Sequence, residues 1–252
     1  MCLIVFAWRQ RPDFPFIVAA NRDEFYDRPT LAADFWEDHP EVLGGRDLKE
    51  QGTWLGITRQ GRFAALTNYR DPRNVKEEAP SRGWLVRDFL TGGETAGEYL
   101  SRLEKEGSRY NGFSIVLGDA GELHYYSNRG GPPISLPPGV YGLSNHLLDT
   151  PWPKVRRVRE GFLRVVNGDG PLEAEVFFAL LGDRRQAPDG ELPDTGIGLE
   201  WERLLSAIFI VSPIYGTRSS TVLIRDEAGG IMFAERQFNN GPEPWMTARF
   251  AW

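Results

Sequence analysis

The chain has 252 residues, 41% of them hydrophobic and 25% charged, which is typical of a folded globular protein and excludes a largely disordered chain or a coiled coil. A formal net charge of −6 argues against broad binding to nucleic acids or to anionic membranes. No apolar run approaches the roughly 20 residues that cross a membrane, and the N-terminus lacks the basic segment of a signal peptide. We therefore expect a cytoplasmic protein with no membrane span and no nucleic-acid partner.

The single cysteine fits a reducing cytoplasm and excludes both an intrachain disulfide and a zinc site made of cysteines. A metal site built from histidines would need all three in the chain, His39, His124 and His146. We therefore expect no metal ion and no other cofactor.

The first third of the chain predicts strands, because apolar, β-branched and aromatic runs alternate with turn residues. The expected strands are Leu3–Arg9, Phe14–Ala20, Trp54–Thr58 and Arg62–Tyr69. Ser81 is expected to cap a helix that runs to Leu90 and stops at Gly92, and Thr95–Lys105 predicts a second helix.

The rest of the chain predicts two more hairpins, a short strand and two helices. The strands are expected at Phe113–Gly118, Glu122–Ser127, Val140–Ser144, Thr217–Arg225 and Ile231–Gln237. Helical spacing covers Lys154–Val166, with Pro153 as a favoured first residue, and a further helix is expected over Leu172–Leu181. The segment Gly182–Glu200 is rich in Gly, Pro and Asp and predicts an exposed loop.

Strands at both ends of the chain with helices between them favour an α+β fold with mainly antiparallel pairing. Hairpins spread over the whole chain favour two stacked sheets over one. No linker interrupts the pattern, so we expect residues 1–252 to form a single domain.

Cys2 is the residue on which a chemical function would depend. It directly follows the initiator Met, and its small side chain permits removal of that Met, so that the mature chain would begin with cysteine. Its thiol and a free α-amine would then share one carbon, and an amine with a pKa of about 7.7–8.0 can act as the base for the thiol. The alternative is that Cys2, at the head of an apolar strand, is a buried core residue.

Polar residues at the ends of predicted strands are candidates to support such a nucleophile. Asn amides suit a developing oxyanion, and Arg and Asp orient a thiolate and an α-ammonium. Turns also place Asn and Asp at these positions, so each residue taken singly fits a cap or turn as well. The candidates are Asn21, Arg22, Asp23, Glu24, Asn68, Asn145 and Arg218.

The chain resembles the NRDE family, which includes the transport-and-Golgi-organisation proteins. The resemblance rests first on Cys2 and on the run Asn21–Glu24. Further matching stretches are Gly44–Asp47, Gly52–Gly56, Thr67–Arg70, Ser81–Gly83, Asn111–Phe113, Leu143–His146 and Thr217–Thr221. The resemblance implies the N-terminal-nucleophile hydrolase fold, a four-layer αββα sandwich of two mainly antiparallel sheets.

A more distant resemblance is to the cysteine-type choloylglycine hydrolases and penicillin V acylases. It implies that Cys2 is the nucleophile, that Asp23 contacts its α-amine, and that Asn68 and Asn145 occupy the positions of the oxyanion site. Arg218 matches a late arginine of those enzymes.

Ala20 departs from those enzymes, because it stands where they carry an arginine. The nearest replacement is Arg22, which strand alternation would keep on the same face.

We therefore expect an amidohydrolase that cleaves a non-peptide C–N amide through an acyl-enzyme on Cys2. The partner would be a small-molecule amide or acyl substrate, and transfer of the acyl group to an amine would use the same residues. Asn21, Trp54, Tyr69 and His146 are candidate substrate contacts, although Trp54 between Thr53 and Leu55 also fits a core position.

The alternative function is non-catalytic. The family resemblance implies a link to haem trafficking and lipid metabolism, so the same scaffold would bind or carry haem or a lipid or acyl metabolite. His124 and His146 are the candidate haem ligands under this hypothesis.

Overall fold

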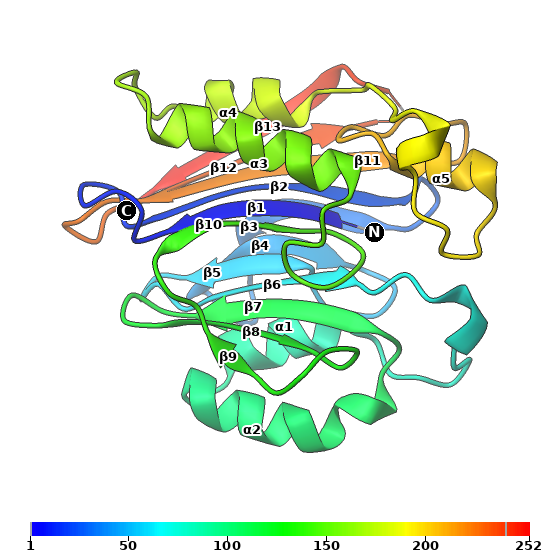
Figure 1. Ribbon diagram of the computed structural model, residues 1–252. Coiled ribbons are helices and arrows are strands. Elements are labelled where there is room, and N and C mark those ends of the chain that lie inside the picture. The colour runs from blue at the N-terminus through cyan, green and yellow to red at the C-terminus, as the bar shows by residue number, and fades with distance from the viewer. Residues whose placement is uncertain (1, 240) are drawn as a thin grey trace. The chain divides into compact units, whose positions relative to one another are not determined.

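The computed structural model describes residues 2–239 and 241–252 (Figure 1). The chain divides into two compact units. The first unit comprises Met1–Asp27, Pro138–Ser144 and Leu148–Trp252, and the second comprises Arg28–Pro137 and Asn145–Leu147. The expectation of a single domain over residues 1–252 stays a prediction.

Six described strands of the first unit form one antiparallel sheet in the order β10-β1-β2-β11-β12-β13. They are β1 (Cys2–Trp8), β2 (Phe16–Phe25), β10 (Gly139–Leu143), β11 (Tyr215–Arg225), β12 (Ile231–Phe238) and β13 (Pro244–Ala251). Cys2 pairs with Arg22 and Trp8 pairs with Phe16, so β1 and β2 form the hairpin that the sequence predicts.

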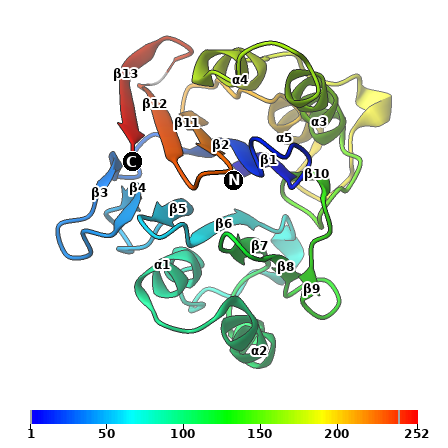
Figure 2. The same cartoon turned by 90° about the vertical axis from the view of Figure 1, so that its left-hand side faces the viewer.

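Helices α3 (Pro153–Val166) and α4 (Ala174–Leu181) lie on one face of this sheet (Figures 1 and 2). Helix α3 begins at Pro153 as expected, because a first helical residue does not need its N–H. The single-turn helix η3 (Asp189–Glu191) and helix α5 (Leu199–Leu205) complete the unit.

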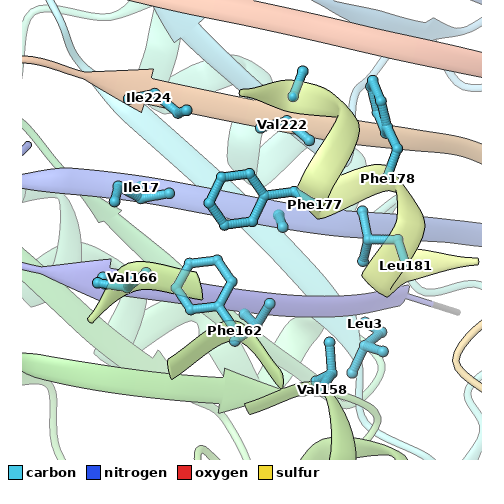
Figure 3. Packing of buried hydrophobic residues seen from close by; sticks show 14 of the residues in the cluster. Leu3, Ile17, Val158, Phe162, Val166, Phe177, Phe178, Leu181, Val222 and Ile224 are labelled. Atoms are coloured by element: carbon cyan, nitrogen blue, oxygen red, sulfur yellow. The ribbon is translucent and has the colours of Figure 1, made fainter. Parts of the chain in front are cut away.

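The core of the first unit fixes which way each strand residue faces (Figure 3). The odd-numbered residues of β1 and the first part of β2 pack against α3 and α4; these are Leu3, Val5, Ala7, Ile17 and Ala19. The rings of Phe162 and Phe177 lie 5.3 Å apart between the two helices. The even-numbered residues of β1, beginning with Cys2, therefore face the opposite side of the sheet.

The described strands of the second unit form a seven-stranded antiparallel sheet, in order from β3 to β9. They are β3 (Thr30–Phe35), β4 (Val42–Asp47), β5 (Leu55–Thr58), β6 (Phe63–Asn68), β7 (Phe113–Gly118), β8 (Leu123–Ser127) and β9 (Ile134–Ser135). Helices α1 (Gly83–Thr91) and α2 (Ala96–Glu106) cover one face of this sheet around an apolar cluster. Two single-turn helices are η1 (Pro72–Asn74) and η2 (Gly107–Arg109).

The expected α+β fold with two mainly antiparallel sheets is confirmed. Strands β3 and β4 were not expected; in β4, Gly44 and Gly45 disfavour a strand in isolation. Both glycines allow close packing: a Cβ at Gly44 would lie 2.7 Å from the Leu55 carbonyl oxygen, and one at Gly45 would lie 2.3 Å from the Trp54 ring. Tertiary packing therefore overrides the local preference.

Three further expectations need correction. Ser81 does not cap α1, which starts at Gly83 with no side-chain hydrogen bond at its cap. Strand β2 does not end at Ala20 but continues to Phe25, because β11 pairs with it along that length. The expected loop Gly182–Glu200 contains η3 and the start of α5. Among the described helices, none has the length and apolar character of a membrane span.

Replacing Phe162 by Ala is expected to lower the free energy of unfolding by about 3–5 kcal/mol, because it leaves a cavity between α3 and α4. Urea unfolding followed by circular dichroism measures the loss. The neighbouring Leu163→Ala is the matched control, since that side chain is 39% exposed. Equal losses in the two variants would contradict the packing described above.

Candidate functional site

The candidate residues are divided between the two units. In the first unit they are Cys2, Asn21, Arg22, Asp23 and Arg218, and in the second they are Trp54, Asn68, Tyr69, Asn145 and His146.

Strand β2 presents its polar run to both faces of the six-stranded sheet. Arg22 pairs with Cys2 and faces the same side as the thiol. Asn21 and Asp23 face the helices, because paired residues share a face and Asn21 pairs with Leu3 of the helix-facing core. The family motif thus serves two different environments.

The side chain of Asn21 joins three segments of the first unit. Its Nδ2 donates to the carbonyl oxygens of Leu181 at 3.0 Å and Ile208 at 2.9 Å, and its Oδ1 accepts from Ser220 Oγ at 2.6 Å. The side chain is buried, so these bonds meet its hydrogen-bonding needs without water. The structure gives Asn21 a scaffold role that holds the end of α4 to the sheet.

Asp23 is a buried carboxylate with a charged neighbour. Thr217 Oγ1 donates to its Oδ1 at 2.8 Å, and the same hydroxyl accepts from the Ile210 N–H at 2.9 Å. Burial raises the pKa of Asp23, while the ammonium of Lys154 opposes this rise. Asp23 follows Arg22 along β2 and therefore lies just beyond the end of β1 at which Cys2 begins.

A β-bulge in β11 explains how the next strand serves both faces. The register shifts between Thr217 and Ser219, so that Thr217 pairs with Asp23 and Ser219 with Arg22. Arg218 is the extra residue. Its Nη1 donates to the Phe25 carbonyl oxygen at 2.8 Å, and burial lowers the pKa of its guanidinium.

Cys2 lies buried at the head of β1. Burial raises the pKa of its thiol; the carboxylate of Asp23 adds to the rise and the guanidinium of Arg22 opposes it. The thiol is therefore protonated at neutral pH, and an attack by sulfur needs a base. Ser219 of β11 pairs with Arg22, which in turn pairs with Cys2. Ser219 is 1% exposed, and its hydroxyl has no hydrogen-bond partner within the described residues.

In the second unit, Arg70 orients the buried amide of Asn145. Arg70 Nη2 donates to Asn145 Oδ1 at 3.4 Å, and Asn145 Nδ2 donates to the Asn68 carbonyl oxygen at 3.1 Å. The backbone N–H of Arg70 also donates to the Asn145 carbonyl oxygen at 2.8 Å. The side chain of Asn68 is only half-buried and makes no hydrogen bond among the residues that the structure describes.

Tyr69 and His146 form a hydrogen-bonded pair whose rings are tilted by 35°. The Tyr69 hydroxyl lies 2.8 Å from His146 Nε2, and the ring centroids are 4.7 Å apart. Burial lowers the pKa of His146, so its ring is neutral at pH 7. Ser114 Oγ donates to the His146 carbonyl oxygen at 3.0 Å, which fixes the backbone of this segment.

The remaining candidates have other surroundings. The ring of Trp54 covers Gly45 of the neighbouring strand. His124 Nε2 lies 3.0 Å from a carboxylate oxygen of Glu122. In the described ranges no group of three or more His, Cys, Asp and Glu side chains is placed to hold a metal ion. The expectation that no metal or cofactor is needed stays a prediction.

Four residues of these environments were not named as site candidates from the sequence: Arg70, Lys154, Thr217 and Ser219. Lys154 carries a signal that is visible in the sequence, because a cation in the first turn of a helix opposes the helix dipole. Arg70 is the last residue of the stretch Thr67–Arg70, two residues after Asn68. Thr217 and Ser219 could not have been assigned to faces, because the bulge between them reverses the alternation.

Comparison with known sequences gives one family. The family model described as Transport and Golgi organisation 2 matches residues 1–240. The chain is 41% identical over 268 residues to the Transport and Golgi organization protein 2 homolog of Bos taurus, covering 98% of this chain and 97% of that protein.

Comparison with solved structures gives distant likenesses. The Caenorhabditis elegans ortholog of N-acylethanolamine-hydrolyzing acid amidase matches with a TM-score of 0.54 at 12% identity, covering 88% of this chain and 92% of that chain. A mutant conjugated bile acid hydrolase from Clostridium perfringens matches with a TM-score of 0.53 at 9% identity, covering 99% and 92%. At these identities the likeness shows the fold alone, and it confirms the expected αββα class.

Asn21→Ala is expected to lower the free energy of unfolding by about 3 kcal/mol, because it leaves two buried carbonyl oxygens without their donor. Chemical unfolding measures this loss. Asn74→Ala is the control, since the Asn74 side chain is exposed and bonds only to the nearby Asp71. A loss for Asn21→Ala no larger than that of the control would contradict the scaffold role.

Proposed function

The chain belongs to the Transport and Golgi organisation 2 family, and on that premise we propose that it is an amidohydrolase that cleaves a non-peptide C–N amide through Cys2. One observation carries the proposal. Cys2 heads β1 in register with Arg22, and Asp23 is the next residue along β2. The solved structures of like fold are named as amide and conjugate hydrolases, which supports the reaction class.

The reaction begins with the mature N-terminus. Removal of Met1 leaves an α-amine on Cys2, and that amine takes the thiol proton as the sulfur attacks the carbonyl carbon of the amide. The C–N bond of the tetrahedral intermediate then breaks, and the amine returns the proton to the leaving nitrogen. Water attacks the resulting thioester, releases the carboxylic acid and regenerates the thiol. No group beyond substrate and water is consumed.

The environment of Cys2 favours this use of a base. Burial raises the pKa of the thiol, so a preformed thiolate is not the resting state. Asp23 orients the α-amine. Arg22, on the same face as the sulfur, stabilises negative charge that develops there. Arg218 supports the same region of β2 through its bond to Phe25.

The resemblance to acylases supplies the oxyanion roles of Asn68 and Asn145. Within the second unit, Arg70 fixes the direction of the Asn145 amide, as a donor to an oxyanion requires. Tyr69, His146 and Trp54 are the proposed substrate contacts, and a neutral His146 suits an uncharged amide. A small-molecule substrate and a cytoplasmic location complete the proposal; acyl transfer to an amine would use the same groups.

Haem binding receives less support from these contacts. His146 is engaged with Tyr69, and His124 lies beside Glu122, so each candidate ligand has a partner within its own unit.

Cys2→Ala is expected to abolish turnover, with a loss of at least about a thousandfold, because the nucleophile is removed. Amide substrates of the two classes named above, an N-acylethanolamine and a conjugated bile acid, are the first probes. p-Nitrophenyl acetate is an activated acyl donor, and intact mass shows whether it acylates the protein. Wild type should lack Met1 and gain one acetyl group on Cys2, and Cys2→Ala should gain none. A retained Met1, or equal acylation of the variant, would overturn the proposal.

Arg70→Met is expected to lower kcat for the acyl donor about tenfold to a hundredfold with little change in KM, because the Asn145 amide loses its orientation. Alkylation of Cys2 by iodoacetamide should stay unchanged, since no oxyanion forms in that reaction. Arg129→Met, at an exposed arginine of the same unit, is the control. Parallel losses of acyl transfer and alkylation would show a general structural defect instead.

A further inference from the structure

The first unit buries two side chains of opposite charge, Asp23 and Lys154. The proposed reaction uses Asp23 but assigns no role to Lys154. Asp23 is 0% exposed and Lys154 is 1% exposed. Burying either charge alone is costly, so each needs a compensating group nearby. Among the neighbouring charges, the ammonium of Lys154 has the largest effect on the pKa of Asp23. It lowers this pKa and so opposes the effect of burial.

The packing of α3 on the sheet places Lys154 and Asp23 at similar positions along the direction of the strands. Figure 3 shows Val158 over Leu3 and Val166 near Ile17, so α3 runs alongside β1. Lys154 precedes Val158 by four residues, or about 6 Å along a helix. Asp23 lies two residues beyond Asn21, the partner of Leu3, which is about 6.6 Å along a strand. Both side chains are therefore at the end of the unit where Cys2 begins.

The position of Lys154 is unfavourable for a helix. It is the second residue of α3, where the helix dipole disfavours a cation, and its side chain is buried. Only a nearby negative charge offsets both costs. The hydroxyl of Thr217 is the polar partner of Asp23 from β11, and Glu24 is a further charge that acts on Asp23 from its own strand.

These charges act on the α-amine that the proposed function requires. Asp23 alone would hold the amine as an ammonium, because a buried carboxylate raises the pKa of an adjacent amine. An ammonium cannot accept the thiol proton. A second cation beside Asp23 removes that effect while leaving the carboxylate in place to orient the amine. Arg22 and Glu24 are further charged groups that act on Cys2.

We propose that Lys154 is a positioning residue that neutralises Asp23, so that the α-amine of Cys2 is unprotonated at neutral pH and able to act as the base. This inference rests on the proposed function, in that it assigns a partner to the same amine. It adds a residue of α3 to a mechanism whose other residues lie on strands or in the loops next to them.

The single cysteine gives a direct measurement. Protein labelled with ¹³C-cysteine shows one Cα and one Cβ signal, and their titration reports the amine and the thiol of Cys2 without any substrate. In Lys154→Met the amine midpoint is expected to rise by at least about one pH unit, because Asp23 is no longer balanced. Arg156→Met removes an exposed cation from the same helix and should leave the midpoint unchanged.

The double variant Asp23→Asn/Lys154→Met removes both charges at once, so it avoids an isolated buried charge and keeps the measurement possible where Lys154→Met destabilises the fold. Its amine midpoint is expected to lie close to that of wild type, whereas Asp23→Asn alone should lower it. An unchanged midpoint in folded Lys154→Met, or a double variant that titrates like Asp23→Asn, would overturn the proposal.

Failure of the proposed function has a different signature. A retained Met1 is seen by mass before any titration, and a processed protein that forms no acyl-enzyme fails in the acylation assay. A processed protein that acylates normally in wild type and in Lys154→Met, with equal amine midpoints, fails only the inference about Lys154.

Discussion

The pairing of β2 with β1 on one side and β11 on the other is the constraint on which the first unit depends. Because β2 is held along its whole length, its polar run stays extended and alternates between the two faces. Asn21 is thereby committed to the scaffold, Arg22 to the face of the thiol, and Asp23 to the helices. Because successive residues of a strand face opposite sides, the neighbouring residues of this motif contact different parts of the unit.

The second unit reaches a fixed geometry by a different route. There, side chains and not strand alternation set the orientation: Arg70 holds the amide of Asn145, and Tyr69 holds the ring of His146. The partners of the Asn145 amide and of the His146 ring hold each group in one orientation. Such preorganisation is what a site for charge development needs, since nothing has to reorient during the reaction.

Local pattern predicted much of this molecule. The hairpin from Leu3 to Ala20 and the start of α3 at Pro153 follow from periodicity, turn chemistry and position in the chain. Strand β4 could not be predicted, because its glycines are explained only by the Leu55 backbone and the Trp54 ring packed against them. The role of Lys154 depends on an approach between the side chains of Lys154 and Asp23 that no sequence spacing encodes.

The bulge at Arg218 has a consequence for how β11 tolerates change. Thr217 and Ser219 keep their partners on β2 on either side of it, so Arg218 is the residue whose deletion would leave every other pair in place. Deletion of a neighbour within the regular part of the strand would instead turn the residues beyond it over to the opposite face. The sheet therefore fixes neither the presence nor the identity of residue 218, and what this arginine adds is its bond to the Phe25 carbonyl oxygen.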